Sequence, residues 1–142
     1  MYKYCNLIRM TVDAYSSCLN HVLLTDSEEV MGLLLGTTQE ESNYQTINIL
    51  STICLNRKCK EKDRVEFDEM QVAKASELAE ALGVEHGLDI HVVGWYHSHP
   101  KITVPPSNVD LNTQYLHQYQ GPFVGIIISC FNNDNSNKNT LK

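Results

Sequence analysis

The sequence predicts a single α/β domain in which helices flank a mixed β-sheet, and three observations lead to this fold class. The chain has 142 residues, which is enough for one domain and too few for two ordinary ones. Hydrophobic residues make up 42% of the chain and charged residues 20%, as in soluble globular proteins. Extended and helical hydrophobic patterns alternate along it, which is typical of helices layered on a sheet.

The N-terminal third predicts a strand, a helix and a second strand. Residues 3–10 mix apolar and β-favouring side chains and predict the first strand. Residues 12–24 carry apolar side chains at helical spacing, so we expect an amphipathic helix there. The short apolar run at 29–36 is bounded by glycine and predicts a buried strand. The polar and acidic stretch 37–43 predicts a loop.

A third strand and a second helix are expected in the middle of the chain. Residues 44–55 have the composition and alternation of a strand. The residues expected on one face of this strand are Ile47, Ile49, Ser51 and Ile53. A highly charged connection follows at 56–64. Beyond it, Asp68 is suited to cap a helix, Gln71 to complete the capping box, and Gly83 to end the helix.

The C-terminal part predicts a strand, a helix and a final strand. Residues 90–96 are β-branched and predict a strand, 107–118 have a helical pattern, and 122–131 predict a strongly apolar strand. Residues 132–142 are polar and rich in asparagine, so we expect a turn or tail there. The predicted domain therefore spans 1–131.

The charge and hydropathy of the chain limit its partners. Its formal net charge is −6, whereas nonspecific nucleic-acid binding normally needs a basic face. Residues 57–62 supply one small basic patch, and for 60–64 composition alone favours a solvated loop over a substrate-facing insertion. No apolar run reaches the roughly 18 residues that a membrane span needs, and the N-terminus lacks the apolar segment of a signal peptide. We therefore expect an intracellular protein with no direct nucleic-acid or membrane partner.

The cysteines predict reduced thiols. The five cysteines are Cys5, Cys18, Cys54, Cys59 and Cys130. Their number is odd and no CxxC pair occurs, which fits an intracellular protein without disulfides. Cys54 and Cys59 would supply half of a second zinc site. No second pair completes that set, so ordinary semi-buried thiols are the favoured interpretation.

The residues that indicate chemistry lie between positions 97 and 110. His97 and His99 are two residues apart on an extended segment, so their side chains point the same way and can reach one ion. Asp110 comes from the following helix and can supply a third ligand. Catalytic zinc sites use three protein ligands and leave the fourth position to water. The His, His, Asp set suits Zn²⁺, although ligand type also allows Mn, Fe or Co.

Simpler interpretations exist for several of these residues. Ser107 and Asp110 also fit a helix capping box, and the two roles are compatible because a capped helix would fix the Asp110 carboxylate. Four other histidines are expected to be ordinary surface or core residues: His21, His86, His91 and His117.

Hydrolysis would also need a base and a group that stabilises the oxyanion. Glu29 opens the apolar strand, which is an unusual place for a charge unless the strand end faces a cleft. Position favours Glu29 over its neighbour Glu28 without excluding the latter.

These residues together resemble the motif of the JAMM, or MPN-plus, metalloproteases. The matching residues are Glu29, Val30, Gly32, Leu33, Gly36, His97, Ser98, His99, Pro100, Ser107 and Asp110. The resemblance implies the MPN fold, a cytidine-deaminase-like mixed sheet flanked by helices. It implies one catalytic Zn²⁺ bound by His97, His99 and Asp110. It also implies that Glu29 is the base and that Ser107 stabilises the tetrahedral intermediate.

Further stretches narrow the resemblance, within this family, to deubiquitinating subunits of the BRISC and BRCA-A complexes. The matching stretches are 18–21, 28–32, 62–66, 92–104, 107–110, 113–114, 123–125 and 129–131. The resemblance implies hydrolysis of isopeptide bonds in lysine-63-linked polyubiquitin. It also implies a catalytically inactive MPN partner of the Abraxas type within a larger complex, and a place in the cytoplasm and nucleus with a link to DNA repair.

The chain departs from the family pattern in two places. Relatives usually carry tryptophan where this chain has Pro105, in the loop beside the predicted site. The family domain continues beyond Phe131 with further strands and helices that assemble with the partner, so the resemblance implies a catalytic domain that is incomplete at its C-terminal end.

Two other functions stay open. One is a noncatalytic MPN scaffold, and the other is an isopeptidase for another ubiquitin linkage or a ubiquitin-like modifier. The complete Glu, His, His, Ser, Asp set favours an enzyme, because scaffolds of the family generally lack part of it.

Overall fold

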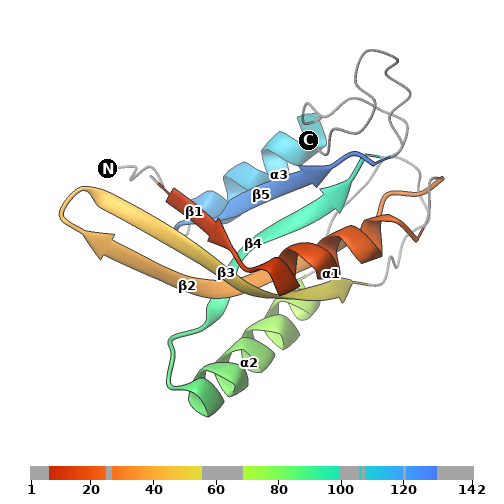
Figure 1. The fold of residues 1–142 in the computed structure, drawn as a ribbon. Coiled ribbons are helices and arrows are strands. Elements are labelled where there is room, and N and C mark those ends of the chain that lie inside the picture. Colours follow the sequence, from red (N-terminus) through yellow and green to blue (C-terminus); the bar gives the residue numbers. More distant parts are fainter. Residues whose placement is uncertain are drawn as a thin grey trace.

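The computed structural model describes residues 7–24, 27–55, 69–99, 106, 108–119 and 121–130. Figure 1 shows the elements that these residues form, in the order predicted from the sequence. The strands are β1 (Leu7–Met10), β2 (Met31–Glu41), β3 (Tyr44–Leu55), β4 (His91–Ser98) and β5 (Val124–Ile128). The helices are α1 (Val12–Val22), α2 (Glu69–His86) and α3 (Asn108–Gln118). The mixed α/β fold is confirmed.

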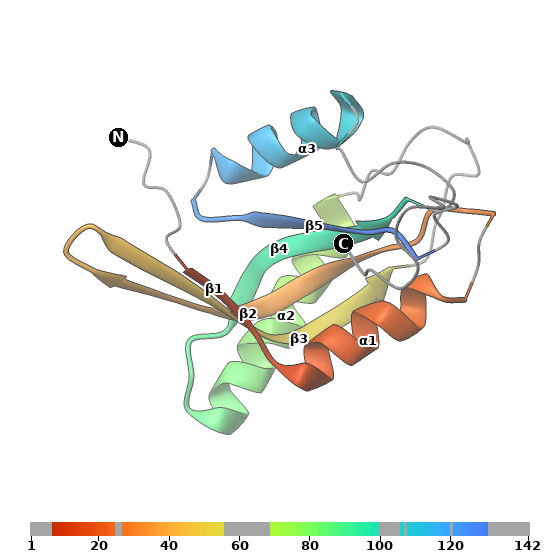
Figure 2. The ribbon, with the colours of Figure 1, turned by 45° about the horizontal axis from the view of Figure 1, so that its top comes forward.

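The sheet has the strand order β1-β3-β2-β4-β5. The central strand β2 pairs antiparallel with β3 and with β4, whereas β1 runs parallel to β3 and β5 runs parallel to β4. Helix α1 covers one face, and α2 lies across the other (Figure 2). Helix α3 shares the face of α2, because Trp95 packs with Ala75 of α2 and donates a hydrogen bond to Gln114 of α3.

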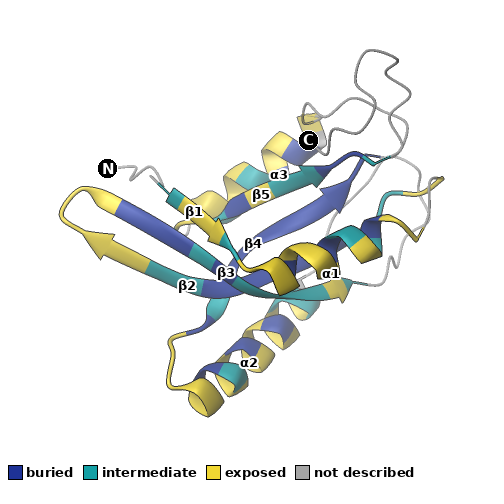
Figure 3. Cartoon of the chain, in the orientation of Figure 1, coloured by how far each residue is buried: buried dark blue, intermediate teal, exposed yellow. Residues whose placement is uncertain are grey.

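The core fills both faces of the sheet. Leu33, Leu34 and Leu35 are all fully buried. Leu34 belongs to the apolar cluster under α1, whereas its two neighbours belong to the clusters under α2. A strand covered on both faces reads as a continuous apolar run, which explains why this segment lacks polar alternation. Figure 3 shows the buried centre of the sheet and the exposed tip of the β2–β3 hairpin.

The predicted loop at 37–43 is wrong. Strand β2 continues to Glu41, and a tight turn at Ser42 and Asn43, with Ser42 at a φ of 51°, leads directly into β3. Pairing with β4 stops at Gly36, so beyond that residue β2 pairs only with β3. Residues 37–41 nevertheless pair with β3 in continuous register, and their polar side chains lie toward the exposed tip of the hairpin, so polarity alone misled the prediction.

The expectation that Ile47, Ile49 and Ile53 share one face of β3 is also wrong. Ile47 and Ile49 pack under α1, whereas Ile53 packs against the α2 clusters. The register shifts between Leu35 and Gly36, which pair with Ser51 and Ile49, so Leu50 is an extra residue. Such a bulge reverses the facing of every later side chain on the strand.

Helix α2 ends later than predicted. It continues through Gly83 to His86, and Gly87, with a φ of +67°, follows it. Gly83 instead allows the returning chain to approach closely: a Cβ at this position would lie 2.4 Å from the carbonyl oxygen of Leu88. The predicted cap at Asp68 lies outside the described residues. Within the described ranges, no helix has the length and hydropathy to cross a membrane. The boundary between residues 131 and 132 lies outside them too and stays a prediction.

Candidate metal centre

The segment that carries both predicted histidine ligands is held by strands on each side. The Ser98 backbone N–H donates to the Val30 carbonyl at 3.0 Å, and the Val30 N–H donates to the Ser98 hydroxyl at 2.9 Å. On the other side the His99 N–H donates to the Ile128 carbonyl at 3.0 Å. The Ser129 hydroxyl donates to the His99 carbonyl at 3.1 Å. The backbone at the end of β4 is therefore fixed by the start of β2 and the end of β5.

His97, His99 and Asp110 meet as a compact buried group, with exposed fractions of 1%, 2% and 5%. The two Nε2 atoms lie 3.0 Å apart. His97 Nε2 lies 3.2 Å from Asp110 Oδ1, and His99 Nε2 lies 3.0 Å from Asp110 Oδ2. A tetrahedral zinc ion with bonds of about 2.0–2.1 Å holds neighbouring ligand atoms about 3.3 Å apart. The three side chains therefore fit three corners of a zinc site, and their role as ligands is carried into the proposal below.

Burial controls the protonation of this group. It lowers the pKa of His97 from its ordinary value, because the imidazolium is poorly solvated there; the Asp110 carboxylate opposes this change and His99 adds to it. The neutral imidazole is the form that binds a metal ion. A buried carboxylate such as Asp110 needs a cation or hydrogen-bond donors beside it, and the two imidazoles and a bound cation would supply that compensation.

Glu29 lies at the edge of the group. Its side chain is 23% exposed, and Oε1 lies 4.0 Å from His99 Nε2. It immediately precedes the Val30 backbone that is bonded to Ser98. Glu28 is exposed. The structure thus brings Glu29 to the metal group, as position along the sequence favoured, and its role as the base stays a prediction.

Several residues of the sequence predictions fall outside the described parts of the chain. These are Ser107, Pro105, Cys59, and the charged stretch 56–64. Asp110 lies in the first turn of α3, and its carboxylate contacts the two histidines. The oxyanion role of Ser107 and the interpretation of Cys59 as an ordinary thiol therefore stay predictions.

The remaining histidines and cysteines form no further metal group within the described parts of the chain. His21 Nδ1 lies 2.7 Å from the Tyr96 hydroxyl, and His117 Nδ1 donates to the Thr113 carbonyl at 2.9 Å. Cys18, Cys54 and Cys130 are free thiols. Burial raises the pKa of Cys18 to about 12, so this thiol stays protonated at neutral pH.

A pocket of about 370 Å³ opens beside the metal group, between β4, β5 and α3. His97 and Asp110 line it together with Trp95 and Gln114. The sequence prediction assigned no role to Trp95 or Gln114. The only signal for them was their place in motif stretches, whereas the structure shows that their side chains are bonded to each other.

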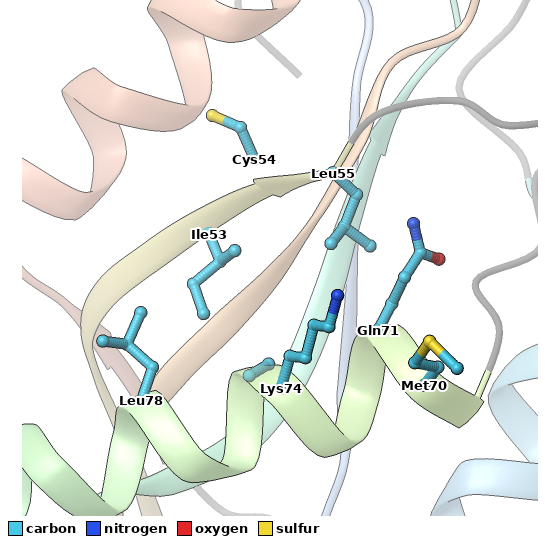
Figure 4. Close-up of a pocket in the computed structure, with 8 residues that line it drawn as sticks. Ile53, Cys54, Leu55, Met70, Gln71, Lys74 and Leu78 are labelled. Carbon is cyan, nitrogen blue, oxygen red and sulfur yellow. The ribbon is translucent and has the colours of Figure 1, made fainter.

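A second pocket, of about 310 Å³, lies between the end of β3 and α2 (Figure 4). Ile53 and Leu55 point from β3 toward α2, and Cys54 points the opposite way. On the α2 side the lining includes Lys74 and Leu78. In register, Met31 pairs with Leu55 on one side and with His97 on the other, so this end of β3 lies at the same end of the sheet as the metal group.

Comparison with known proteins agrees with this geometry. Residues 4–122 match the family model described as JAB1/Mov34/MPN/PAD-1 ubiquitin protease. The Lys-63-specific deubiquitinase BRCC36 of Homo sapiens is 42% identical over 92% of this chain and 48% of its own length. The mouse protein of that name is 43% identical over 92% of the chain and 53% of its own length, and the Xenopus tropicalis protein 46% identical over 89% and 48%.

A solved structure supports the fold alone. The solution structure of protein DSY2949 from Desulfitobacterium hafniense has a TM-score of 0.59 and 21% identity, covering 86% of this chain and 74% of that one. The chain spans about half the length of the curated relatives cited above. The family match covers most of the chain and includes both histidines and the aspartate of the buried group. The chain therefore belongs to the JAB1/Mov34/MPN/PAD-1 family, with the His, His, Asp group of its JAMM metalloproteases.

Proposed function

We propose that this chain carries the catalytic site of a zinc-dependent deubiquitinase that hydrolyses isopeptide bonds in lysine-63-linked polyubiquitin. The observation that carries the proposal is the buried triangle of His97, His99 and Asp110, whose spacing suits one tetrahedral ion. The choice of substrate rests on the name of the relatives, Lys-63-specific deubiquitinase, at 42% to 46% identity.

The chain's own residues would divide the chemistry as follows. His97 and His99 would bind the ion through Nε2, and Asp110 through a carboxylate oxygen. A bound zinc ion lowers the pKa of water to near neutrality and polarises a carbonyl. Glu29 Oε1, at the exposed edge of the group, would accept the proton of the attacking water and pass it to the leaving lysine amine. Ser107 would stabilise the oxyanion, by resemblance to the family motif.

The substrate's tail would lie extended along the edge of β3. Among the described residues, β1 pairs with β3 only as far as Ile49, so residues 51–55 have a strand partner on the β2 side alone. An extended peptide can add to such an edge through backbone hydrogen bonds. Three strand spacings, about 14 Å in all, separate a strand added at this edge from β4, and about four extended residues cover that distance. The pocket of Figure 4 would receive an apolar side chain of the tail.

The proposed protein works in a complex. Its partner would be a catalytically inactive MPN protein of the Abraxas type, in a larger assembly of the cytoplasm and nucleus with a link to DNA repair. A surface for protein contacts is available on α3: the exposed apolar side chains there are Leu111, Tyr115, Leu116 and, just after the helix, Tyr119, with exposed fractions of 52% to 74%. Such clusters are uncommon on surfaces that face only water.

The test is Glu29→Gln with Glu28→Gln as its matched control. Glu29→Gln should abolish cleavage of lysine-63-linked diubiquitin while bound zinc, measured by atomic absorption, remains at one per chain. Glu28→Gln should keep both. Retained cleavage by Glu29→Gln would refute the base, and unchanged zinc content in His97→Ala and Asp110→Ala would refute the ligands.

The same assay separates the other two functions. Differently linked diubiquitins would be offered with and without the inactive MPN partner. Cleavage of lysine-63 linkages alone supports the proposal, and cleavage of another linkage or of a ubiquitin-like conjugate would change the substrate. A zinc-loaded chain that cleaves nothing even with its partner would be a noncatalytic scaffold.

A further inference from the structure

The ring of Trp95 lies between a proposed metal ligand and helix α3. On one side it stacks on the His97 imidazole, with ring centroids 4.5 Å apart and an angle of 21° between the planes. At its edge, the indole Nε1–H donates a 2.8 Å hydrogen bond to Gln114 Oε1. Trp95 is 1% exposed, whereas Gln114 is half-buried. His97 and Gln114 are thus linked through one buried indole.

The stacking contributes to the orientation of the His97 ring. Metal-binding histidines usually donate their second ring N–H to an acceptor, which fixes the ring. The His97 Nδ1 atom is buried and has no hydrogen-bond partner within the part of the chain that the structure describes. The flat contact with Trp95 therefore restrains the His97 ring where a hydrogen bond at Nδ1 is missing, in addition to the contacts of Nε2 with His99 and Asp110.

Gln114 is chemically matched to its two partners. An indole N–H can only donate and a backbone carbonyl can only accept. The Gln114 Oε1 accepts from Trp95, and its Nε2 donates to the Phe123 carbonyl just before β5. A carboxamide supplies both groups at once, whereas a carboxylate lacks the donor and an aliphatic side chain lacks both.

Gln114 also acts on the third ligand. It follows Asp110 by four residues on α3, so the two side chains lie on the same side of the helix, one turn apart. The bonds from Gln114 to β4 and to the Phe123 carbonyl fix this turn against the sheet. Both line the pocket beside the metal group. One side chain therefore restrains the positions of His97 and Asp110 together.

Gly125 on β5 provides the space for this arrangement. A Cβ at Gly125 would lie 2.8 Å from Gln114 Oε1 and 3.0 Å from Trp95 Nε1, the two atoms of the hydrogen bond. Gly125 itself is exposed, so a methyl group there would meet this pair without entering the core.

We propose that Gln114 is a positioning residue of the metal centre: through its bond to Trp95 it orients His97, and through its place on α3 it sets Asp110. This inference rests on the proposed function, because it presupposes that the group binds zinc. Trp95 and Gly125 belong to the same arrangement, Trp95 as the hydrogen-bond donor and Gly125 as the residue that leaves space for the bond. The effect expected for loss of such a supporting contact is about a tenfold weaker metal affinity.

The experiment measures the zinc Kd of the full chain by competition with a chelator, and the visible absorption bands of the Co²⁺-substituted chain. Gln114→Leu removes the acceptor of the hydrogen bond, Trp95→Phe removes the donor, and Gly125→Ala places a methyl group against both atoms. Each should raise the zinc Kd about tenfold and alter the Co²⁺ bands, with unchanged far-ultraviolet circular dichroism. The double variant with Gln114→Leu and Trp95→Phe should be no worse than either single one, because both remove the same bond.

Val22→Ala is the control for a general loss of stability. Val22 is 1% exposed and lies in the core under α1, on the other face of the sheet. It should lower the Tm and leave the zinc Kd and the Co²⁺ bands unchanged. Values for Gln114→Leu and Gly125→Ala within twofold of the parent chain, with the same bands, would overturn the proposal. A parent chain that binds no zinc would instead refute the proposed metal site itself.

Discussion

The hydroxyl of Ser98 connects the fold of this protein to its proposed base. Ser98 is 1% exposed, ends β4 and lies between His97 and His99, and its Oγ accepts the Val30 N–H at 2.9 Å. In Ser98→Ala the backbone bond from the Ser98 N–H to the Val30 carbonyl remains, but the Val30 N–H loses its acceptor. The change therefore loosens the strand start that immediately follows Glu29.

The size of the effect follows from the burial of the donor that is left. A buried polar group without a partner costs about 1–3 kcal/mol, and Val30 is only half-buried, so we expect about 1.5 kcal/mol. For a chain of this size, that corresponds to a fall in Tm of roughly 5 °C. The zinc Kd should stay within about twofold, because the hydroxyl faces Val30 and not the ligand atoms. Cleavage should fall roughly tenfold as Glu29 loses its fixed position.

The assay is urea unfolding of the metal-free chain, combined with zinc titration and diubiquitin cleavage. Ser17→Ala is the matched control, because Ser17 is an exposed serine on α1 and its loss should change stability by less than about 0.5 kcal/mol. Equal stability of the two variants would show that the Ser98 hydroxyl contributes nothing to the fold. A large rise in zinc Kd for Ser98→Ala would show that the Ser98 hydroxyl positions the zinc ligands as well as Glu29.

Two further predictions concern Gly36 on β2 and His21 on α1. In Gly36→Ala the new Cβ would lie 1.7 Å from the Asn48 carbonyl oxygen, a backbone atom that cannot turn aside, so we expect the free energy of unfolding in urea to fall by at least about 3 kcal/mol. The control is Gly87→Ala, where no atom lies within 4 Å of the new Cβ but φ is +67°, and its free energy of unfolding should fall by only about 1 kcal/mol. Equal losses in the two variants would show that the contact at Gly36 does not decide the effect. Burial lowers the pKa of His21 below its ordinary 6.5. As the pH falls below 6.5, the unfolded chain therefore takes up this proton before the folded chain does, and the folded state loses stability. In His21→Gln the urea midpoint should decline less between pH 6.5 and 5.5 than in the parent chain, and an identical decline would refute the role of His21.

Much of the site was predictable because its residues are close in sequence. His97 and His99 are two residues apart at the end of β4, where an extended backbone brings both rings to one side. Asp110 opens the next helix, as its place in a capping pattern indicated. Trp95 and Gln114 were not predictable as a pair, because their hydrogen bond joins β4 to α3 and no local spacing indicates which side chains meet there.

The choice between Glu28 and Glu29 likewise depended on tertiary contacts more than on local sequence. Both precede the same apolar run, and position alone favours Glu29 without excluding Glu28. The structure separates them, because the pairing of Val30 with Ser98 fixes the strand start so that Glu29 lies 4.0 Å from His99 and Glu28 is exposed.

The sequence by itself determined the order of the elements, the burial of 33–35 on both faces, and the metal-binding residue types, because these depend on local propensity and short spacing. Only the tertiary structure decided the length of the β2–β3 hairpin and which side chains of β3 and β4 face α1 or α2. In β4, Gly94 pairs with Leu34 and Val92 with Leu35, so Val93 is an extra residue, as Leu50 is in β3. These two bulges reverse the alternation in their strands. Their positions depend on how neighbouring strands pair, and a strand's own alternation carries no record of its partner's register.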